Sequence, residues 1–278
     1  MKALRQKQNN RLDLEGSQVG LETSSQTQES PVTSQSKLNA VESALAKTAV
    51  VIPVRNEEDS LPHVLRDLPS VGLIVVADNG SSDLSAQLAS RAGCEVAHVA
   101  QPGYGRACLG GMARIEKLIE EADTSVDFIA FVDGDYSDHV HLLPELLAPI
   151  VRNHADFVLG SRMLGDREKG AMHLQAIWGN RLACFLMNRI WKTSYTDLGP
   201  FRVIRRSSLN QLGMRDETFG WTIEMQIRAA RAGLRALEIP VPYRRRIGVS
   251  KISGTVTGTV RAGYKILWTI AKYGLAKN

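Results

Sequence analysis

Residues 48–58 read TAVVIPVRNEE, and this stretch decides the fold class of the chain. Its first seven residues, 48–54, form a short apolar run of strand length, which predicts a buried β-strand. A polar loop that starts at Arg55 follows the run directly. Similar short apolar runs recur along the chain, at 72–77, 95–99, 127–132 and 156–159.

Amphipathic segments of helix length separate these runs, at about 58–68, 82–92, 105–122 and 140–153. Strands that alternate with helices predict βαβ units, and therefore an α/β protein with a mostly parallel sheet and helices on both faces. Longer helical stretches follow near 172–193, 219–232 and 255–274. Ligands of such sheets bind beyond the carboxyl ends of the strands, so the residues after each run are candidate site residues.

The composition is that of an ordinary globular protein, with 44% hydrophobic and 23% charged residues among 278, which excludes a fibre or a wholly disordered chain. Three cysteines without a CxxC pair favour a reducing, cytoplasmic compartment. No apolar run reaches the roughly 18 to 20 residues of a spanning helix, so we expect neither a membrane span nor export. Residues 1–45 are rich in Gln, Ser and Thr and predict a disordered polar tail.

The positive charge is concentrated at the end of the chain. Residues 228–278 hold eleven Lys or Arg and one acid, whereas the whole chain has a formal charge of +5. Such a block indicates an anionic partner or a solvated face. Within it, 253–278 predicts a basic amphipathic helix that packs on the core, binds a partner helix or lies peripherally on the inner face of a membrane. Nucleic acid is disfavoured because no stacking aromatics interleave the cations.

Acidic residues follow two of the predicted strands. Asp78 ends the second run, and Asp133-Gly134-Asp135 follows the fourth. Ser82 and Asp83 are explained by helix capping, but Asp78 needs another role. The carboxylates of Asp133 and Asp135 repel each other unless a cation lies between them. A Mg²⁺ or Mn²⁺ ion held by Asp133 and Asp135, with a substrate diphosphate completing its shell, is the interpretation we favour.

Three motifs in this order, VIPVRNEE (51–58), DNGSSD (78–83) and DGD (133–135), resemble those of the family-two glycosyltransferases, which have the Rossmann-like GT-A fold. Later motifs, including YRRRIGVSK (243–251), are similar to the branch of dolichyl-phosphate and polyprenyl-phosphate sugar synthases. The resemblance implies a GT-A domain over residues 46–252. One departure is that His139 and its neighbours replace a proline that the branch usually carries after DGD.

The resemblance implies a nucleotide-sugar donor, a UDP- or GDP-hexose. It assigns donor binding to residues after the strands: Pro53, Asn56, Glu57, Asp78, Gln101, Gly103, Asp133 and Arg162. Asp135 would bind the metal on the diphosphate, and Arg202 would lie near the acceptor phosphate.

The acceptor decides the chemistry. An ionised phosphate attacks the anomeric carbon without a base but needs cations, which Arg244, Arg246 and Lys251 could supply. A hydroxyl acceptor needs a general base, for which Glu224 and Asp197 are candidates. We expect an inverting, metal-dependent hexosyltransferase that acts on polyprenyl phosphate. The alternative is a soluble transferase with a small-molecule or glycan hydroxyl acceptor.

Overall fold

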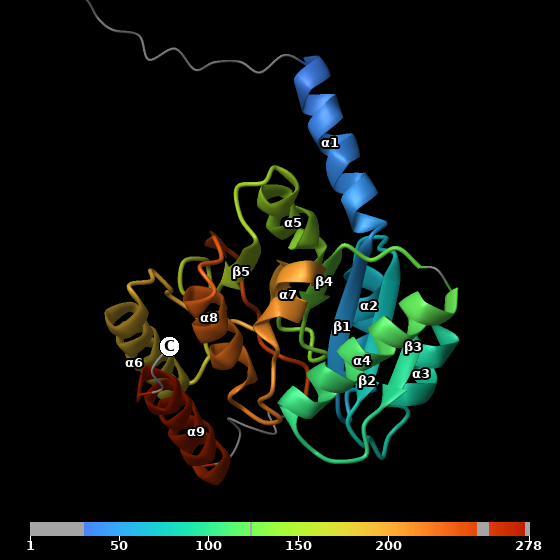
Figure 1. Ribbon diagram of the computed structural model, residues 1–278. Helices are drawn as coiled ribbons and strands as arrows, with labels where there is room; N and C mark the ends of the chain where they lie inside the picture. Colours follow the sequence, from blue (N-terminus) through green and yellow to red (C-terminus); the bar gives the residue numbers. More distant parts are fainter. Residues whose placement is uncertain (1–30, 123, 249–255, 276–278) are drawn as a thin grey trace, which may run out of the picture.

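The computed structural model of the protein describes residues 31–122, 124–248 and 256–275 (Figure 1). The strands are β1 (Thr48–Val54), β2 (Leu73–Asp78), β3 (Glu95–His98), β4 (Phe128–Phe131), β5 (Phe157–Ser161), β6 (Arg202–Arg205) and β7 (Ala236–Pro240). The helices are α1 (Pro31–Leu45), α2 (Leu61–Asp67), α3 (Ser85–Arg91), α4 (Tyr104–Ala122), the 3-10 turn η1 (Val140–Leu142), α5 (Leu143–Val151), α6 (Leu174–Trp191), α7 (Arg206–Leu212), α8 (Trp221–Arg231) and α9 (Val256–Leu275).

The seven strands form one sheet in the order β3-β2-β1-β4-β6-β5-β7. Strand β1 pairs in parallel with β2 and β4, and β6 runs antiparallel to its neighbours β4 and β5. The expected α/β fold with a mostly parallel sheet is therefore confirmed. Because β1, β2 and β4 are parallel neighbours, the loops after them meet at one edge of the sheet.

The side chains of β1 alternate between two buried layers, which explains why the strand is apolar throughout. Val50 and Ile52 pack with α2 and α5 on one face, and Ala49 and Val51 pack with α4 on the other. A Cβ added at Gly111 would lie only 2.6 Å from Val51 Cγ1, so this glycine lets α4 approach the sheet closely. Helices α1, α2, α3 and α5 contribute to one layer, and α4, α6, α7, α8 and α9 to the other.

The expected disordered tail is wrong for residues 31–45, which form α1. Ala44 and Leu45 are buried against the layer that contains α5, and Val41 packs beside them. The Thr48 hydroxyl also donates a 2.8 Å hydrogen bond to the Ala44 carbonyl and ties the helix end to β1. The spacing of these apolar residues is helical, but the polar residues between them concealed the pattern. Residues 1–30 lie outside the described residues.

The C-terminal helix α9 packs on the body of the protein, as one of the three interpretations of this segment predicted. Thr269 and Ile270 are buried, and Ile266 and Tyr273 pack against the same core layer. The expected boundary of the domain at residue 252 falls in 249–255, outside the described residues, and stays a prediction. Within the part of the chain that the structure describes, no helix has both the length and the apolar character that a membrane crossing requires.

Candidate active site

A cleft of about 440 Å³ opens where β1, β2 and β4 end. Its floor comes from the loops after these strands, and its far wall comes from the segment before α8 and from the basic C-terminal region. The lining residues are Pro53, Val54, Arg55, Glu57, Asn79, Pro102, Gly103, Tyr104, Ala107, Asp133, Gly134, Asp135, Thr218, Phe219, Arg246 and Arg261.

The two acids after β4 are both held by hydrogen bonds. Asp133 Oδ1 accepts a 3.0 Å hydrogen bond from the Tyr104 hydroxyl. Asp135 Oδ1 accepts from the amide and the hydroxyl of Ser137, at 2.9 and 2.5 Å. Burial raises the pKa of Asp133, while the positive charge of Arg246 opposes that rise. Both carboxylates are thus fixed in place at the floor of the cleft.

Arg246 forms an ion pair with Asp135 Oδ2 across the cleft. Asp135 is 3% exposed, so its carboxylate is covered rather than open to solvent. The Arg246 guanidinium thus places positive charge directly beside the Asp135 carboxylate. Hard carboxylate oxygens from Asp133 and Asp135 suit Mg²⁺ or Mn²⁺, which usually take one or two protein carboxylates and fill the other positions with substrate oxygens and water. The described residues contain no cluster of three or more side chains of the metal-binding types His, Cys, Asp and Glu.

The loop before α4 is fastened to the end of β2 by Asn79. Its Oδ1 accepts a 2.7 Å hydrogen bond from the Gly103 amide, and its Nδ2 donates to the Gln101 carbonyl at 2.7 Å. A Cβ at Gly103 would lie 2.3 Å from the Glu217 carbonyl oxygen, so only glycine allows this approach. The sequence-based prediction of site residues missed Asn79 and Tyr104, although both follow or precede an expected element directly.

The other residues expected to bind the donor divide into two groups. Pro53, Glu57 and Gly103 line the cleft, as do Asp133 and Asp135. Three more support the loops beside it, and the roles expected of them toward a donor stay predictions. Asp78 is buried and accepts from the Ser81 amide, Asn56 accepts from the Ser82 amide, and the Gln101 side chain is exposed.

Arg202 does not face an acceptor, and this expectation is wrong. Its side chain is fully buried. The guanidinium donates to the carbonyls of Leu198 at 3.3 Å, Gly199 and Thr222 at 3.0 Å. A buried cation needs such partners because desolvation is costly. Arg202 therefore ties β6 to α8 beneath the site.

The two candidate bases are also engaged elsewhere. Asp197 is fully buried and holds both Nε and Nη2 of Arg162, each at 2.8 Å. Burial alone would raise the pKa of Asp197, but the Arg162 guanidinium lowers it below its ordinary value, which suits an ion pair rather than a base. Arg162 is thus ion-paired with Asp197, and the role expected of it toward a donor sugar stays a prediction. Glu224 is 2% exposed and accepts from the Asp216 amide and the Tyr273 hydroxyl, both at 2.6 Å.

Of the three other cations expected to bind the acceptor, the structure places one in the cleft. Arg246 lines it. Arg244 instead stacks on the Tyr136 ring, 3.8 Å from its centroid, and donates to the Asp138 carbonyl. Lys251 lies outside the described residues. Arg261 of α9, which the sequence-based prediction did not include, also lines the cleft.

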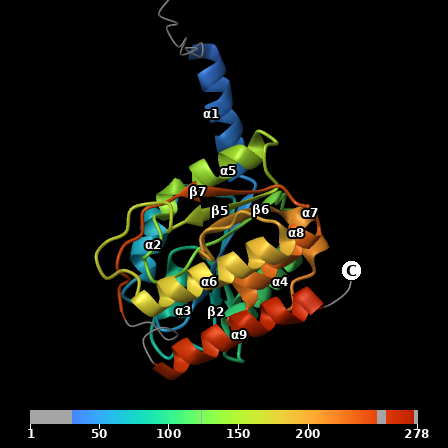
Figure 2. The same cartoon turned by 90° about the vertical axis from the view of Figure 1, so that its left-hand side faces the viewer.

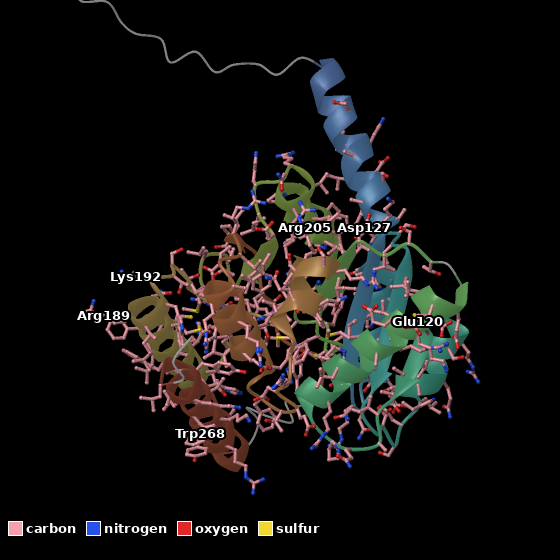
Figure 3. All side chains as sticks on the ribbon, viewed as in Figure 1. Glu120, Asp127, Arg189, Lys192, Arg205 and Trp268 are labelled. Carbon is pink, nitrogen blue, oxygen red and sulfur yellow. The ribbon has the colours of Figure 1, made fainter. Side chains whose placement is uncertain are left out.

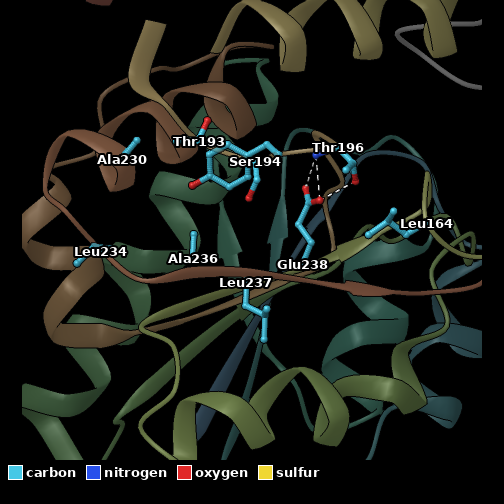
Figure 4. Close-up of a pocket in the computed structure, with 10 residues that line it drawn as sticks. Leu164, Thr193, Ser194, Thr196, Ala230, Leu234, Ala236, Leu237 and Glu238 are labelled. Atoms are coloured by element: carbon cyan, nitrogen blue, oxygen red, sulfur yellow. Dashed lines mark hydrogen bonds between the residues drawn. The ribbon is translucent and has the colours of Figure 1, made fainter. Parts of the chain in front are cut away.

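A second hollow, of about 410 Å³, lies beside the edge strand β7 (Figure 4). Its one acid, Glu238, accepts hydrogen bonds from the amide and hydroxyl of Thr196, at 2.9 and 2.6 Å. The lining residues include no cation. This hollow therefore lacks the groups that hold a diphosphate, and the cleft at the strand ends is the better candidate.

Comparisons with known proteins bear on the family and the fold of the chain. Residues 49–213 match the family model described as glycosyl transferase family 2. The chain is 35% identical over 218 residues to an uncharacterized glycosyltransferase of Mycobacterium tuberculosis, a match that covers 77% of this chain and 93% of that protein. It is 30% identical over 211 residues to the dolichyl-phosphate hexose transferase of Haloferax volcanii, covering 73% of this chain and 86% of the relative.

A solved structure shows the same fold. Glucosyl-3-phosphoglycerate synthase from Mycobacterium tuberculosis, in complex with Mn²⁺, UDP-glucose and phosphoglyceric acid, superposes with a TM-score of 0.65 at 19% identity. The match covers 86% of this chain and 84% of that one. The expected GT-A fold is confirmed.

Proposed function

The chain belongs to glycosyl transferase family 2, and from that membership we propose that it transfers a hexose from a nucleoside diphosphate sugar to a polyprenyl phosphate. In this reaction an acceptor phosphate oxygen bonds to the anomeric carbon as the bond from that carbon to the nucleoside diphosphate breaks. A single displacement of this kind inverts the configuration. An ionised acceptor has no proton to lose, so the step needs no general base.

The donor would lie in the cleft at the strand ends. Pro53 and Glu57 at the end of β1 would contact the nucleoside, and the Gly103 loop would approach it closely. Asp133 and Asp135 would hold the divalent ion beside the diphosphate. When bound, that ion supplies positive charge that offsets the charge on the leaving group. The solved relative was crystallised in complex with Mn²⁺ and UDP-glucose, which supports this type of site.

The choice of a phosphate acceptor depends on one observation. Cationic side chains line the cleft, while the carboxylates of both candidate bases are ion-paired outside it. Arg246 and Arg261 line the cleft. Asp197 is paired with Arg162, and Glu224 with Arg228. A phosphate acceptor needs this distribution, because cations must bring several phosphate groups together and no base is required. The dolichyl-phosphate hexose transferase among the relatives is consistent with this assignment.

The test is nucleoside diphosphate release from a panel of UDP- and GDP-hexoses with Mn²⁺, with and without polyprenyl phosphate. We expect polyprenyl phosphate to stimulate release and to appear as a glycolipid. Arg246→Ala or Arg261→Ala should lower transfer about ten- to a hundredfold, because each removes a charge-assisted contact. Slow hydrolysis of the donor by water should change much less.

Arg245→Ala is the matched control, since the Arg245 guanidinium is exposed and donates to the Lys169 carbonyl away from the cleft. It should transfer normally. Release that is stimulated by 3-phosphoglycerate or a glycan, and not by polyprenyl phosphate, would show that the acceptor is a hydroxyl compound.

A further inference from the structure

The outer sides of α6 and α9 expose large apolar side chains. Among the described residues, thirteen large hydrophobic side chains are classed as exposed, and nine of them belong to these two helices. They are Leu174, Trp178, Leu182, Phe185 and Ile190 of α6 and Tyr264, Leu267, Trp268 and Leu275 of α9. A concentration of this kind usually marks an interaction surface.

Core packing does not explain the outer residues of α9. At about 100° per residue, Tyr264, Trp268 and Leu275 fall within roughly 40° of one another on the helix. Thr269 and Ile270, which are buried, lie on the side that faces the protein. Tyr264 is 68% exposed and Trp268 54%. The helix is therefore apolar on its outer side as well as on its core side.

Helix α6 has the same two-sided character. Trp178, 68% exposed, and Phe185, 64% exposed, lie on one stripe with Leu174. Ala183 and Met187 are buried on the other side of the helix.

The two stripes form one surface, which we call the α6–α9 face. The helices lie side by side at one end of the protein in both views (Figures 1 and 2). Contact is close at one point, because a Cβ added at Gly274 would lie 3.6 Å from Ile190 Cδ1. The apolar side chains of both helices thus belong to a single outer face.

This face is basic and carries no acid of its own. Neither α6 nor α9 contains Asp or Glu. Arg181, Arg189, Lys192 and Lys272 are exposed on or directly after these helices. Figure 3 shows Arg189, Lys192 and Trp268 on this outer side of the protein. The inner cation Lys265 is paired with Asp216 at 2.8 Å and Arg261 lines the cleft, so the exposed cations named above supply the positive charge of this face.

We propose that the α6–α9 face docks on a bilayer that contains anionic phospholipids. Exposed tryptophans and aliphatic residues flanked by Lys and Arg are the composition of an interfacial surface, with rings at headgroup depth and cations against lipid phosphates. A second copy of the chain fits less well, because a two-fold contact would bring these cations together without acids to pair them.

The surface adjoins the cleft. Arg261 lines the cleft, and Trp268 follows on the same helix after a rise of about 10 Å. A docked protein would hold the cleft near the headgroups, where a lipid-linked phosphate lies. The purpose of docking rests on the proposed function, but the docking itself can be measured without any sugar transfer.

The experiment is sedimentation of the full chain with vesicles of phosphatidylcholine alone or mixed with phosphatidylglycerol. We expect binding to the mixed vesicles that weakens with added salt. Trp178→Ser, Phe185→Ser and Trp268→Ser combined should lower binding roughly a hundredfold, since three large side chains lose their burial in lipid. Leu38→Ser on α1, where the leucine is 59% exposed, should bind as the parent does.

A second readout locates the contact. Brominated lipids should quench the fluorescence of Trp178 and Trp268, while the buried Trp221 should not be quenched; the half-buried Trp191 is present in parent and variant alike. The triple variant should keep its circular dichroism spectrum and its transfer to a short, water-soluble acceptor phosphate. Failure of transfer in both the parent and the triple variant would count against the proposed function and would leave the docking proposal untouched.

Equal vesicle binding by the triple variant and the parent would overturn the proposal. So would an absence of binding by the parent. Ultracentrifugation that finds a parent dimer and a monomeric triple variant would assign the face to a second copy instead.

Discussion

Asp138 is a buried carboxyl group beside the cleft, where its Oδ2 accepts a 3.3 Å hydrogen bond from the Asp133 amide. It is 1% exposed, and its Oδ1 has no hydrogen-bond partner among the described residues. Burial, with the nearby charge of Asp133 adding to it, raises the pKa of Asp138 to about 7. The folded protein therefore favours the protonated acid at a pH where the unfolded chain has already lost the proton.

This difference in protonation makes stability depend on pH. Between about pH 4 and about pH 7 the folded state holds a proton on Asp138 that the unfolded chain has lost, so the contribution of Asp138 to the free energy of unfolding falls as pH rises. Asp138→Asn removes that loss. Relative to the parent, the variant should gain at least about 1.4 kcal/mol between about pH 5 and about pH 8, the equivalent of one pKa unit. Urea unfolding with chelator present measures it.

Asp166→Asn is the control, because the Asp166 side chain is exposed. Its stability should follow the parent at each pH. Parallel curves for Asp138→Asn and the parent would contradict the assigned protonation.

Among single residues, the sequence predicted the location of the acids that follow the strands better than the location of the candidate general bases or of the arginines. Asp133 and Asp135 were expected at the cleft because polar residues that follow a buried strand lie at the sheet edge, whereas Glu57 was expected from the family resemblance; all three line the cleft. Asp197 and Arg202 are charged as well, but Asp197 is fully buried in its ion pair with Arg162, and Arg202 is fully buried among backbone carbonyls. Only the three-dimensional partners separate a buried charge from one in a site, and a sequence does not show them.

Among the helices and strands, Glu224 joins three segments. Its carboxylate accepts from the amides of Arg215 and Asp216, from Arg228 on the same helix α8, and from Tyr273 on α9. Glu224→Gln keeps the size and shape of the side chain, but it replaces one carboxylate oxygen by an NH₂ group that faces hydrogen-bond donors and cannot accept from them. We expect a loss of about 1 to 3 kcal/mol in the free energy of unfolding, because buried donors lose their acceptor.

Transfer per folded molecule should be nearly unchanged in that variant, because Glu224 lies outside the cleft. Tyr273→Phe is the matched variant, since it removes one of the same hydrogen bonds and should cost less. A Glu224→Gln protein of parental stability without transfer would restore the role of Glu224 as a base and favour a hydroxyl acceptor.

The two strands that we did not predict from the sequence, β6 and β7, lack a recognisable apolar run. Strand β6 has four residues, RVIR, with an arginine at each end. Strand β7 lies at the sheet edge with little buried, so its residues show no apolar run. Of the strands that were predicted, β1, β2, β4 and β5 lie inside the sheet and carry continuous apolar runs, which burial on both faces requires, while β3 lies at the other edge.

For the protein as a whole, the alternation of strands and helices predicted the layers but not the strand order. Strand β6 enters antiparallel between β4 and β5, although it follows both in sequence. Pairing over that separation depends on the entire folded chain rather than on local propensity. The convergence of β1, β2 and β4 was predictable because parallel neighbours end at the same edge.

That convergence leads to a prediction for the complete protein. A ligand that bridges the β1, β2 and β4 loops, the α4 loop and the C-terminal region binds only the folded state and must stabilise it. UDP or GDP at about 100 times its dissociation constant, with Mn²⁺, should add about 2.7 kcal/mol. For a chain of this size the midpoint of thermal unfolding should rise by roughly 5 to 10 °C.

The part of this rise that depends on Mn²⁺ should vanish in Asp135→Asn, because Asp135 would hold the ion against the diphosphate. Glu120→Gln, on α4 and away from the lining of the cleft, should keep the full rise. Calorimetry with each nucleotide, with Mn²⁺ or with chelator, measures both. A rise that is the same with chelator, or that persists in Asp135→Asn, would mean that the nucleotide binds without the ion and that Asp135 serves only its pair with Arg246.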